Sequence, residues 1–275
     1  MTVLIQYWHD GRPDARIAAL LDSFGKWNPE LQRKLFDAGD AERLIGDRCD
    51  DRAVGAFRAC AAPAMQADYF RYCAAHALGG ICADADCLCL GSIAPLLDEV
   101  EAGRLFKTAS GVLPNGLFGF VAPGHPLPAI ARELATELIE MRFDGNVAEV
   151  TGPGIFTSLY WLHQARSISE FLRCAERGAV PDPGDLRDPA LHGELRRASG
   201  LTSSKPGRLF RLAAEVAGGR EGLERAFEGV RVSSAREALE RWAAHGDGSA
   251  RRDRGATHWR SRRRAIYRQL PSRST

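Results

Sequence analysis

The chain has 275 residues, of which 45% are hydrophobic and 26% charged, as in ordinary soluble globular proteins. That length is enough for one large α/β domain or two small ones. No stretch approaches the ~20 apolar residues of a membrane span, and the start of the chain lacks a basic region followed by an apolar core. The net charge of +2 is unevenly distributed, because residues 251–275 carry nine arginines and one aspartate. The last 25 residues therefore sum to +8 and the rest of the chain to −6.

Hydrophobic periodicity predicts an alternation of strands and helices along the first two thirds of the chain. Such an alternation favours an α/β fold with a doubly wound, mostly parallel sheet. The expected strands are residues 3–8, 31–37, 81–83, 105–108 and 117–121. The expected helices are residues 14–25, 41–45, 51–60, 65–78, 93–100, 127–142, 155–163, 206–217, 221–227 and 235–245, the last behind a serine cap at Ser233 or Ser234. Residues 174–206, rich in Gly, Pro, Asp and Arg, predict a long loop.

The stretch 65–90 is the part of the sequence that points most clearly to chemistry. Asp68 and Arg71 are three residues apart on the predicted helix 65–78, so they share one helix face. Gly79 and Gly80 end that helix, because glycine takes a left-handed conformation without steric cost. A short buried strand is expected to follow, and after it an acidic turn that contains Asp84 and Asp86.

Asp84 and Asp86 come directly after that strand, with one residue between them. On an extended backbone this spacing directs both carboxylates to the same side. Adjacent carboxylates repel each other and are tolerated where a cation or a hydrogen-bonding ligand completes the site. Oxygen ligands favour Mg²⁺ or Mn²⁺, which take part of their coordination shell from substrate phosphates. The alternative is a solvated turn, since the bare tripeptide Asp-x-Asp is common.

The full pattern D-x-x-R-x7-G-G-x3-D-x-D, from Asp68 to Asp86, resembles the DXD sugar-binding region of glycosyltransferase family 32. The resemblance implies a GT-A-like, Rossmann-type fold with a helical C-terminal extension. It also implies a metal-dependent, retaining glycosyltransferase that uses Mn²⁺ or Mg²⁺. The donor would be a UDP- or GDP-linked sugar and the acceptor a glycan or a lipid-linked molecule. A role in bacterial surface polysaccharide synthesis, in the cytoplasm or at the inner face of the membrane, is the corresponding expectation.

The same resemblance implies roles for individual residues. Asp86, with Asp84, would hold the metal against the donor phosphates, and Asp84 would also contact ribose or sugar hydroxyls. Asp68 and Arg71 would orient the sugar. The remaining matches are Trp8, which would pack on the nucleobase, Asn115, which would reach the sugar hydroxyls, and His258, which would help to hold the metal. Trp8 as a core aromatic and Asn115 as a turn residue before Gly116 remain open.

The seven cysteines are odd in number and mostly lie in apolar surroundings, which indicates buried, reduced thiols rather than disulfides. Zinc bound by Cys82, Cys87 and Cys89 is a weaker alternative, because their spacing matches common zinc motifs poorly. The Thr151-Gly152-Pro153 element is either a rigid turn into a helix or a contact to phosphate or acceptor.

The predicted organisation is a nucleotide-sugar-binding catalytic domain over 1–173, a loop and helical acceptor or lid region over 174–250, and a basic segment over 251–275. The arginines of 251–275 fit pyrophosphate, acidic glycans or an anionic membrane surface, or else form a plain basic tail. Two rival functions remain: a non-catalytic sugar-nucleotide-binding protein, and an anionic-polymer binder acting through this segment. Nucleic acid is not the expected partner, because the body of the chain is acidic.

Overall fold

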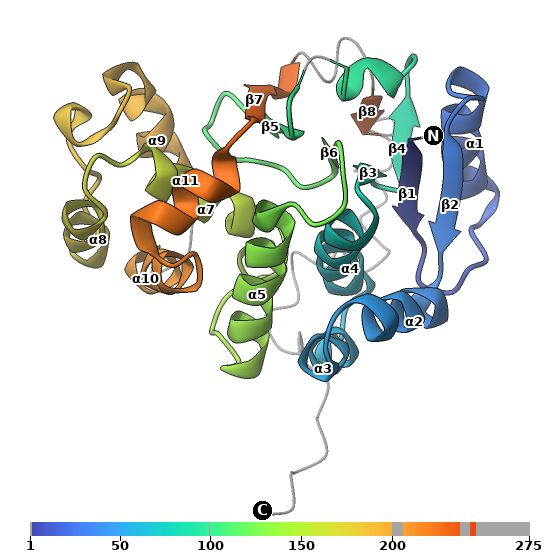
Figure 1. The fold of residues 1–275 in the computed structure, drawn as a ribbon, viewed down its shortest axis with the longest axis horizontal. Coiled ribbons are helices and arrows are strands. Elements are labelled where there is room, and N and C mark those ends of the chain that lie inside the picture. Colours follow the sequence, from blue (N-terminus) through green and yellow to red (C-terminus); the bar gives the residue numbers. More distant parts are fainter. Residues whose placement is uncertain (1, 99, 200–205, 237–242, 246–275) are drawn as a thin grey trace, which may run out of the picture.

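The computed structural model describes residues 2–98, 100–199, 206–236 and 243–245, and the remaining positions are outside the description. Its centre is a sheet with the strand order β2-β1-β3-β6-β5-β7 (Figure 1). These strands are β1 (Val3–Tyr7), β2 (Gln32–Phe36), β3 (Gly80–Ala83), β5 (Gly103–Lys107), β6 (Leu117–Phe120) and β7 (Val230–Ser234). A separate pair is formed by β4 (Cys87–Cys89) and β8 (Ala243–His245).

The strand directions place several loops at one edge of the sheet. Strands β2, β1 and β3 are parallel, β6 is antiparallel to β3 and β5, and β5 is parallel to β7. The carboxyl ends of β1, β3 and β5 and the amino end of β6 therefore meet at the same edge. In α/β sheets, ligands bind outside the carboxyl ends of strands, so this edge is where a site is expected.

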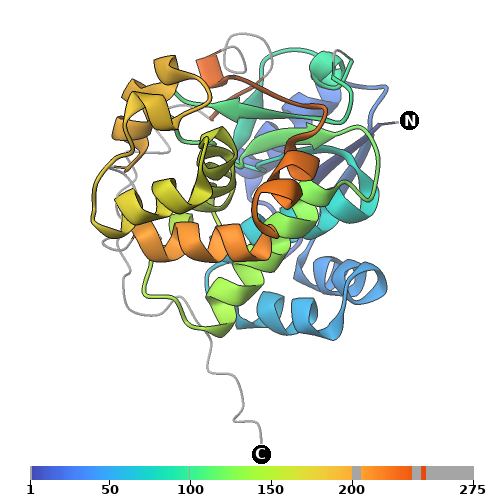
Figure 2. The ribbon, with the colours of Figure 1, turned by 60° about the vertical axis from the view of Figure 1, so that its left-hand side comes forward.

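Helices cover both faces of the sheet and form a further group beyond β7 (Figures 1 and 2). The largest buried cluster joins α4, α5 and α7 to one sheet face, while α1 and β4 pack on the other. Helices α8 and α9 lie on the opposite side of the molecule from α1 (Figure 1). The helices are α1 (Ala15–Trp27), α2 (Ala38–Arg48), α3 (Asp51–Ala59), α4 (Pro63–Leu78), α5 (Pro126–Glu140), α6 (Val147–Val150), α7 (Pro153–Gln164), α8 (Ile168–Glu176), α9 (His192–Ser199), α10 (Pro206–Val216) and α11 (Gly219–Phe227), with 3₁₀ turns at Ala94–Leu96, Pro183–Asp185 and Pro189–Leu191.

The expected fold class is confirmed: the protein is α/β, with a mixed, mostly parallel sheet flanked by helices. Three of the predicted secondary-structure elements are wrong. The loop expected over 174–206 contains α9, the helix expected over 93–100 is a single 3₁₀ turn, and 235–245 ends in strand β8. Ala243 and Ala244 pair with β4 as a strand despite the helix propensity of alanine. No helix in the described ranges is long and apolar enough to cross a membrane.

The Gly79-Gly80 pair lets α4 end directly against the sheet. Gly79 has φ +65° and Gly80 φ +82°, backbone conformations that L side chains rarely adopt. Gly79 has ψ −153°, so it is not the left-handed helical cap that the sequence predicted. A Cβ on Gly80 would lie 2.4 Å from the carbonyl oxygen of Val3 on β1. This close approach aligns β3 beside β1 and fixes where the acidic turn emerges.

Strand β4 is fastened to α1 by buried polar contacts. Asn28, at the end of α1, is fully buried, and its Oδ1 accepts from the backbone N–H of Ile93 at 2.6 Å. Its Nδ2 donates to Phe24 O at 3.0 Å, and Ser23 Oγ accepts from the N–H of Cys89 at 2.9 Å. These contacts tie the segment after the acidic turn to the first helix.

Candidate active site

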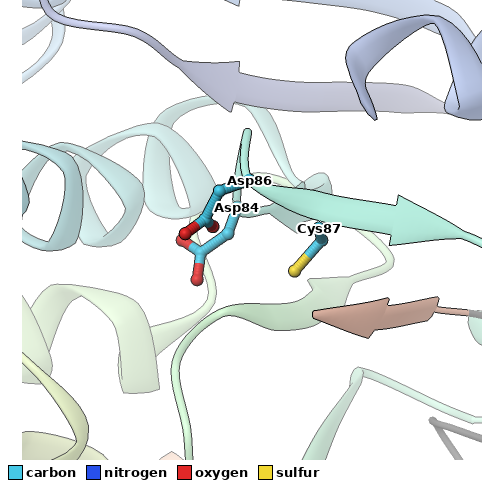
Figure 3. A group of neighbouring side chains, drawn as sticks. All are labelled: Asp84, Asp86 and Cys87. Atoms are coloured by element: carbon cyan, nitrogen blue, oxygen red, sulfur yellow. The ribbon is translucent and has the colours of Figure 1, made fainter. Parts of the chain in front are cut away.

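The acidic turn connects β3 to β4 at the carboxyl edge of the sheet. The N–H of Cys87 donates to Asp84 O at 3.2 Å, which closes a four-residue β-turn. The N–H of Asp84 donates to Gly116 O at 2.8 Å and so joins the turn to the start of β6. The predicted acidic turn is therefore present. The extended backbone expected to align the two carboxylates is not, and the turn itself brings them together (Figure 3).

Among the described residues, one group of side chains could hold a metal ion. It consists of Asp84, Asp86 and Cys87, whose ligand atoms all lie within 4.8 Å of one another (Figure 3). Asp86 is exposed, Asp84 is partly exposed and Cys87 is buried. Burial, together with the charge of the neighbouring Asp86, raises the pKa of the Cys87 thiol to about 12. A neutral thiol is a poor ligand for a hard cation. The two carboxylates thus fit Mg²⁺ or Mn²⁺, with Asp86 the more accessible ligand.

Arg71 lies behind the turn and forms ion pairs with both Asp68 and Asp84. The side chains of Arg71 and Asp68 are only 5% and 12% exposed, against 25% for Asp84. Arg71 Nε is buried and has no hydrogen-bond partner within the described part of the chain. The prediction that Asp68 and Arg71 share one face of α4 is confirmed. Their ion pair, and the second ion pair from Arg71 to Asp84, follow from the structure.

Asn115 reaches the same cluster from the loop before β6. It is 4% exposed, and its Nδ2 donates to Asp68 Oδ1 and to the Tyr72 hydroxyl, each at 3.0 Å. Tyr72 donates in turn to the carbonyl of Thr151 at 2.8 Å, and Thr151 Oγ1 lies 3.4 Å from Asp68 Oδ2. Asn115 is therefore part of a buried network rather than an isolated turn residue. That it contacts a sugar stays a prediction.

Two members of this network were not assigned to it from sequence. Tyr72 is four residues beyond Asp68, so the helical period places both on one face of α4. This spacing could have placed Tyr72 beside Asp68, but it is not specific, because tyrosine is common in helix cores. The sequence predicts for Thr151 either a rigid turn or a contact to phosphate or acceptor. Its contact with Asp68 depends on how α6 packs beside α4. A Cβ on Gly152 would lie 3.2 Å from Asp68 Oδ2 and 2.8 Å from Ala148 Cα, so glycine leaves room for the carboxylate.

Desolvation raises the pKa of Asp68 to about 6, although Arg71, Asn115 and Thr151 each lower it. The folded state therefore binds this proton more tightly than the unfolded chain does, and ionised Asp68 costs stability. That cost appears as pH rises from about 4 to 6 and is removed as pH falls through 6.

This predicts a pH-dependent difference between the wild type and Asp68→Asn. As pH falls from 7 to 5, the wild type should gain about 1 kcal/mol of unfolding free energy relative to Asp68→Asn, which has no proton to bind. Urea unfolding of both proteins at pH 7 and pH 5 measures this change in unfolding free energy. Parallel changes in the two proteins would show that Asp68 does not titrate in this range.

Trp8 lies next to the acidic turn, as the strand order predicts. It is partly exposed and packs against the buried cluster of Ile17, Leu21 and Ala85, and Ala85 is the middle residue of the Asp-Ala-Asp turn. Trp8 is thus neither fully buried nor remote from Asp84. Its stacking on a nucleobase stays a prediction. His258 and the basic segment 251–275 lie outside the described residues.

Together these features define a mixed α/β protein with a paired-carboxylate turn at the carboxyl edge of its sheet. No protein-family model matches the chain, and no curated protein matches its sequence. Among solved structures, one named "PaToxG Glycosyltransferase" is similar over 83% of this chain and 85% of that one, with 14% sequence identity and a TM-score of 0.45. Membership of glycosyltransferase family 32 therefore stays a prediction from the motif.

Proposed function

We propose that the protein is a metal-dependent glycosyltransferase that takes a sugar from a nucleotide-diphosphate donor, with retention of configuration, and passes it to a glycan or lipid-linked acceptor. One observation carries the proposal: two carboxylates, from Asp84 and Asp86, lie side by side at the carboxyl edge of the sheet with a buried arginine beneath them. The DXD-type pattern that contains these residues supports the same reaction class. Bacterial surface polysaccharide is the acceptor class we infer from the resemblance.

Charge balance supports a divalent cation at the turn. Asp68, Asp84 and Asp86 bring three negative charges when ionised, and Arg71 compensates one of them. The remaining charge of −2 matches Mg²⁺ or Mn²⁺. Such a cation would supply Lewis-acid stabilisation of the leaving diphosphate.

Some residues of the site would bind the cation, and others would position those ligands and the donor. Asp86, exposed at the tip of the turn, would bind the cation, and Asp84 would share it while Arg71 fixes its orientation. Asp68 and Arg71 would fix the position of the acidic turn relative to α4, and both would lie close to the bound sugar. Trp8, beside Ala85, would stack on the nucleobase of a UDP- or GDP-linked donor.

Thermal-shift measurements on the full chain test this proposal. UDP, GDP and their glucose, galactose and mannose derivatives would be added with and without Mn²⁺ to the wild type, to Asp86→Ala and to Asp47→Ala. A ligand at about 100 times its dissociation constant stabilises the folded state by about 2.7 kcal/mol. For a chain of this size that corresponds to a rise of roughly 5–10 °C in Tm. We expect this rise with one nucleotide class, dependent on Mn²⁺, in the wild type.

The two variants locate the effect. Asp47 is an exposed aspartate on α2, so Asp47→Ala should respond as the wild type does. Asp86→Ala should fold normally, because Asp86 is exposed, and should lose the Mn²⁺-dependent rise. No shift with any nucleotide in a folded wild type would refute the proposal. A shift that persists in Asp86→Ala would remove the metal role from this residue.

Two other functions are distinguished by simple measurements. A non-catalytic sugar-nucleotide binder would show the same thermal shift but no Mn²⁺-dependent hydrolysis or transfer of the sugar. An anionic-polymer binder would show steeply salt-dependent binding that disappears when residues after Asp253 are removed. The acidic turn favours the transferase over the anionic-polymer binder, and sugar transfer distinguishes it from the non-catalytic binder.

A further inference from the structure

Helix α9 is joined to the carboxyl end of β5 by a mostly buried ion pair, on the side of the molecule where the sheet ends in β5 and β7 (Figure 1). Lys107 is the last residue of β5, and its Nζ lies 2.5 Å from Glu194 Oε2 on α9. The two side chains are 14% and 27% exposed. Lys107 also donates to the Tyr160 hydroxyl at 3.3 Å and lies over the Tyr160 ring, 5.3 Å from its centroid. The ion pair therefore brings β5, α7 and α9 together.

The same helix lies against the loop that follows β5. Arg197 Nε on α9 donates to the carbonyl oxygen of Ala109 at 2.9 Å. Gly111 has φ +77°, and a Cβ there would lie 2.7 Å from the Glu194 carbonyl oxygen and 2.9 Å from Trp161 Cζ2. Trp161 Nε1 donates to Gly111 O at 3.0 Å. Glycine at this position thus lets the loop pack closely against both α9 and α7.

This β5–β6 loop, residues 108–116, connects α9 to the candidate active site. Backbone hydrogen bonds close its beginning into a turn. Further along the loop, Asn115 Nδ2 donates to Asp68 Oδ1 at 3.0 Å. The carbonyl oxygen of Gly116 accepts from the N–H of Asp84 at 2.8 Å. The β5–β6 loop therefore contacts α9 at its beginning and the acidic turn at its end.

We propose that Lys107 and Glu194 are positioning residues for the acidic turn, and through it for the donor: their ion pair holds α9 against the β5–β6 loop, and the loop fixes Asn115 and Asp84. The effect on the donor rests on the proposed function, whereas the effect on the turn does not. Breaking a partly buried ion pair leaves an uncompensated charge. We therefore expect α9 to shift from the loop when the charges of the pair no longer match, and the loop to hold the acidic turn less firmly.

Hydrogen exchange of the full chain, followed by mass spectrometry, tests the effect on the acidic turn without any ligand. Glu194→Lys places two cations together, and the exchanged pair Lys107→Glu/Glu194→Lys restores opposite charges. We expect Glu194→Lys to speed exchange roughly 2- to 30-fold in peptides that cover the β5–β6 loop and the acidic turn, including the N–H of Asp84. The exchanged pair should return these peptides to the wild-type rate.

Donor affinity of the same variants is measured with UDP-glucose and GDP-mannose, each with Mn²⁺. Glu194→Lys should bind the nucleotide sugar that the wild type binds roughly 2- to 30-fold more weakly, and the exchanged pair should recover the wild-type affinity. Glu221→Lys is the matched control, because it makes the same change in an exposed ion pair with Arg225 on α11 and should behave as the wild type. Glu194→Gln removes the charge with almost no change of shape, so it should act in the same direction and replaces Glu194→Lys if that variant does not fold.

The two measurements separate the ways in which the proposal can fail. Faster exchange confined to α9 and the start of the loop would show that the ion pair only attaches α9, and would overturn the proposal. Wild-type donor affinity in Glu194→Lys would do the same, and so would an exchanged pair no closer to the wild type than Glu194→Lys. If the wild type binds neither nucleotide sugar, the proposed function fails, and the exchange of the acidic turn still decides whether Lys107 and Glu194 position it.

Discussion

Replacing Arg71 by methionine is expected to lower the free energy of unfolding by about 3–5 kcal/mol, because it leaves a buried charge without its partner. Arg71 is 5% exposed and pairs with Asp68, which is itself nearly inaccessible. Asp84 is 25% exposed and can turn part of its carboxylate to water, so Asp68 bears most of the penalty. Urea unfolding at pH 7, where Asp68 is mostly ionised, measures the loss.

Arg173→Met is the matched control. Arg173 pairs with Glu170 three residues earlier on a helix, as Arg71 pairs with Asp68, but its side chain is 56% exposed and that of Glu170 45%. Exposed ion pairs contribute about 0–1 kcal/mol. Equal losses in the two variants would show that burial of the Arg71 pair is not what makes it important. Adding Asp68→Asn to Arg71→Met should recover part of the lost stability, because the orphaned carboxylate is then gone.

Replacing Gly80 by alanine is expected to lower the free energy of unfolding by a similar amount. The cause here is backbone strain and steric overlap rather than an unpaired charge. The positive φ of Gly80 strains any other residue by about 1–3 kcal/mol. The added Cβ would also lie 2.4 Å from the Val3 carbonyl oxygen, which is held in β1. Overpacking of this kind typically adds about 1–3 kcal/mol. Thermal or urea unfolding of Gly80→Ala measures the sum.

Gly124→Ala separates the two contributions. Gly124 has φ +83°, almost the value at Gly80, but a Cβ there would have no neighbour within 4 Å. Gly124→Ala should therefore lower the free energy of unfolding only by the strain of the backbone conformation, about 1–2 kcal/mol. If Gly80→Ala were no more destabilising than Gly124→Ala, the close approach of β3 to β1 would not be tight in solution.

Arg71 and Gly80 support the same feature from two sides. Gly80 lets β3 start beside β1 immediately after α4, and Arg71 reaches from α4 to the residue that follows β3. The position of Asp84 therefore depends on both the helix and the strand. A variant at either residue should impair the metal-dependent donor binding that we propose, even though neither residue would bind the metal.

The sequence by itself determined the elements of the central stretch and the identity of the paired carboxylates. Helical spacing placed Asp68 and Arg71 on one face, and the glycine pair marked the end of α4. These inferences succeed because they depend on neighbours a few residues apart. The same local reasoning missed α9 and β8, whose conformations are set by what they pack against.

Only the tertiary structure decided how these residues work together. The turn geometry of Asp84 and Asp86 depends on the hydrogen bond to Gly116, more than thirty residues away in the sequence. The network of Asn115, Tyr72 and Thr151 around Asp68 exists because α4, α6 and the loop before β6 converge, and no short-range pattern encodes that convergence. Burial then decides the charge states, because desolvation depends on everything packed around a group: it raises the pKa of Asp68 to about 6, against the pull of Arg71.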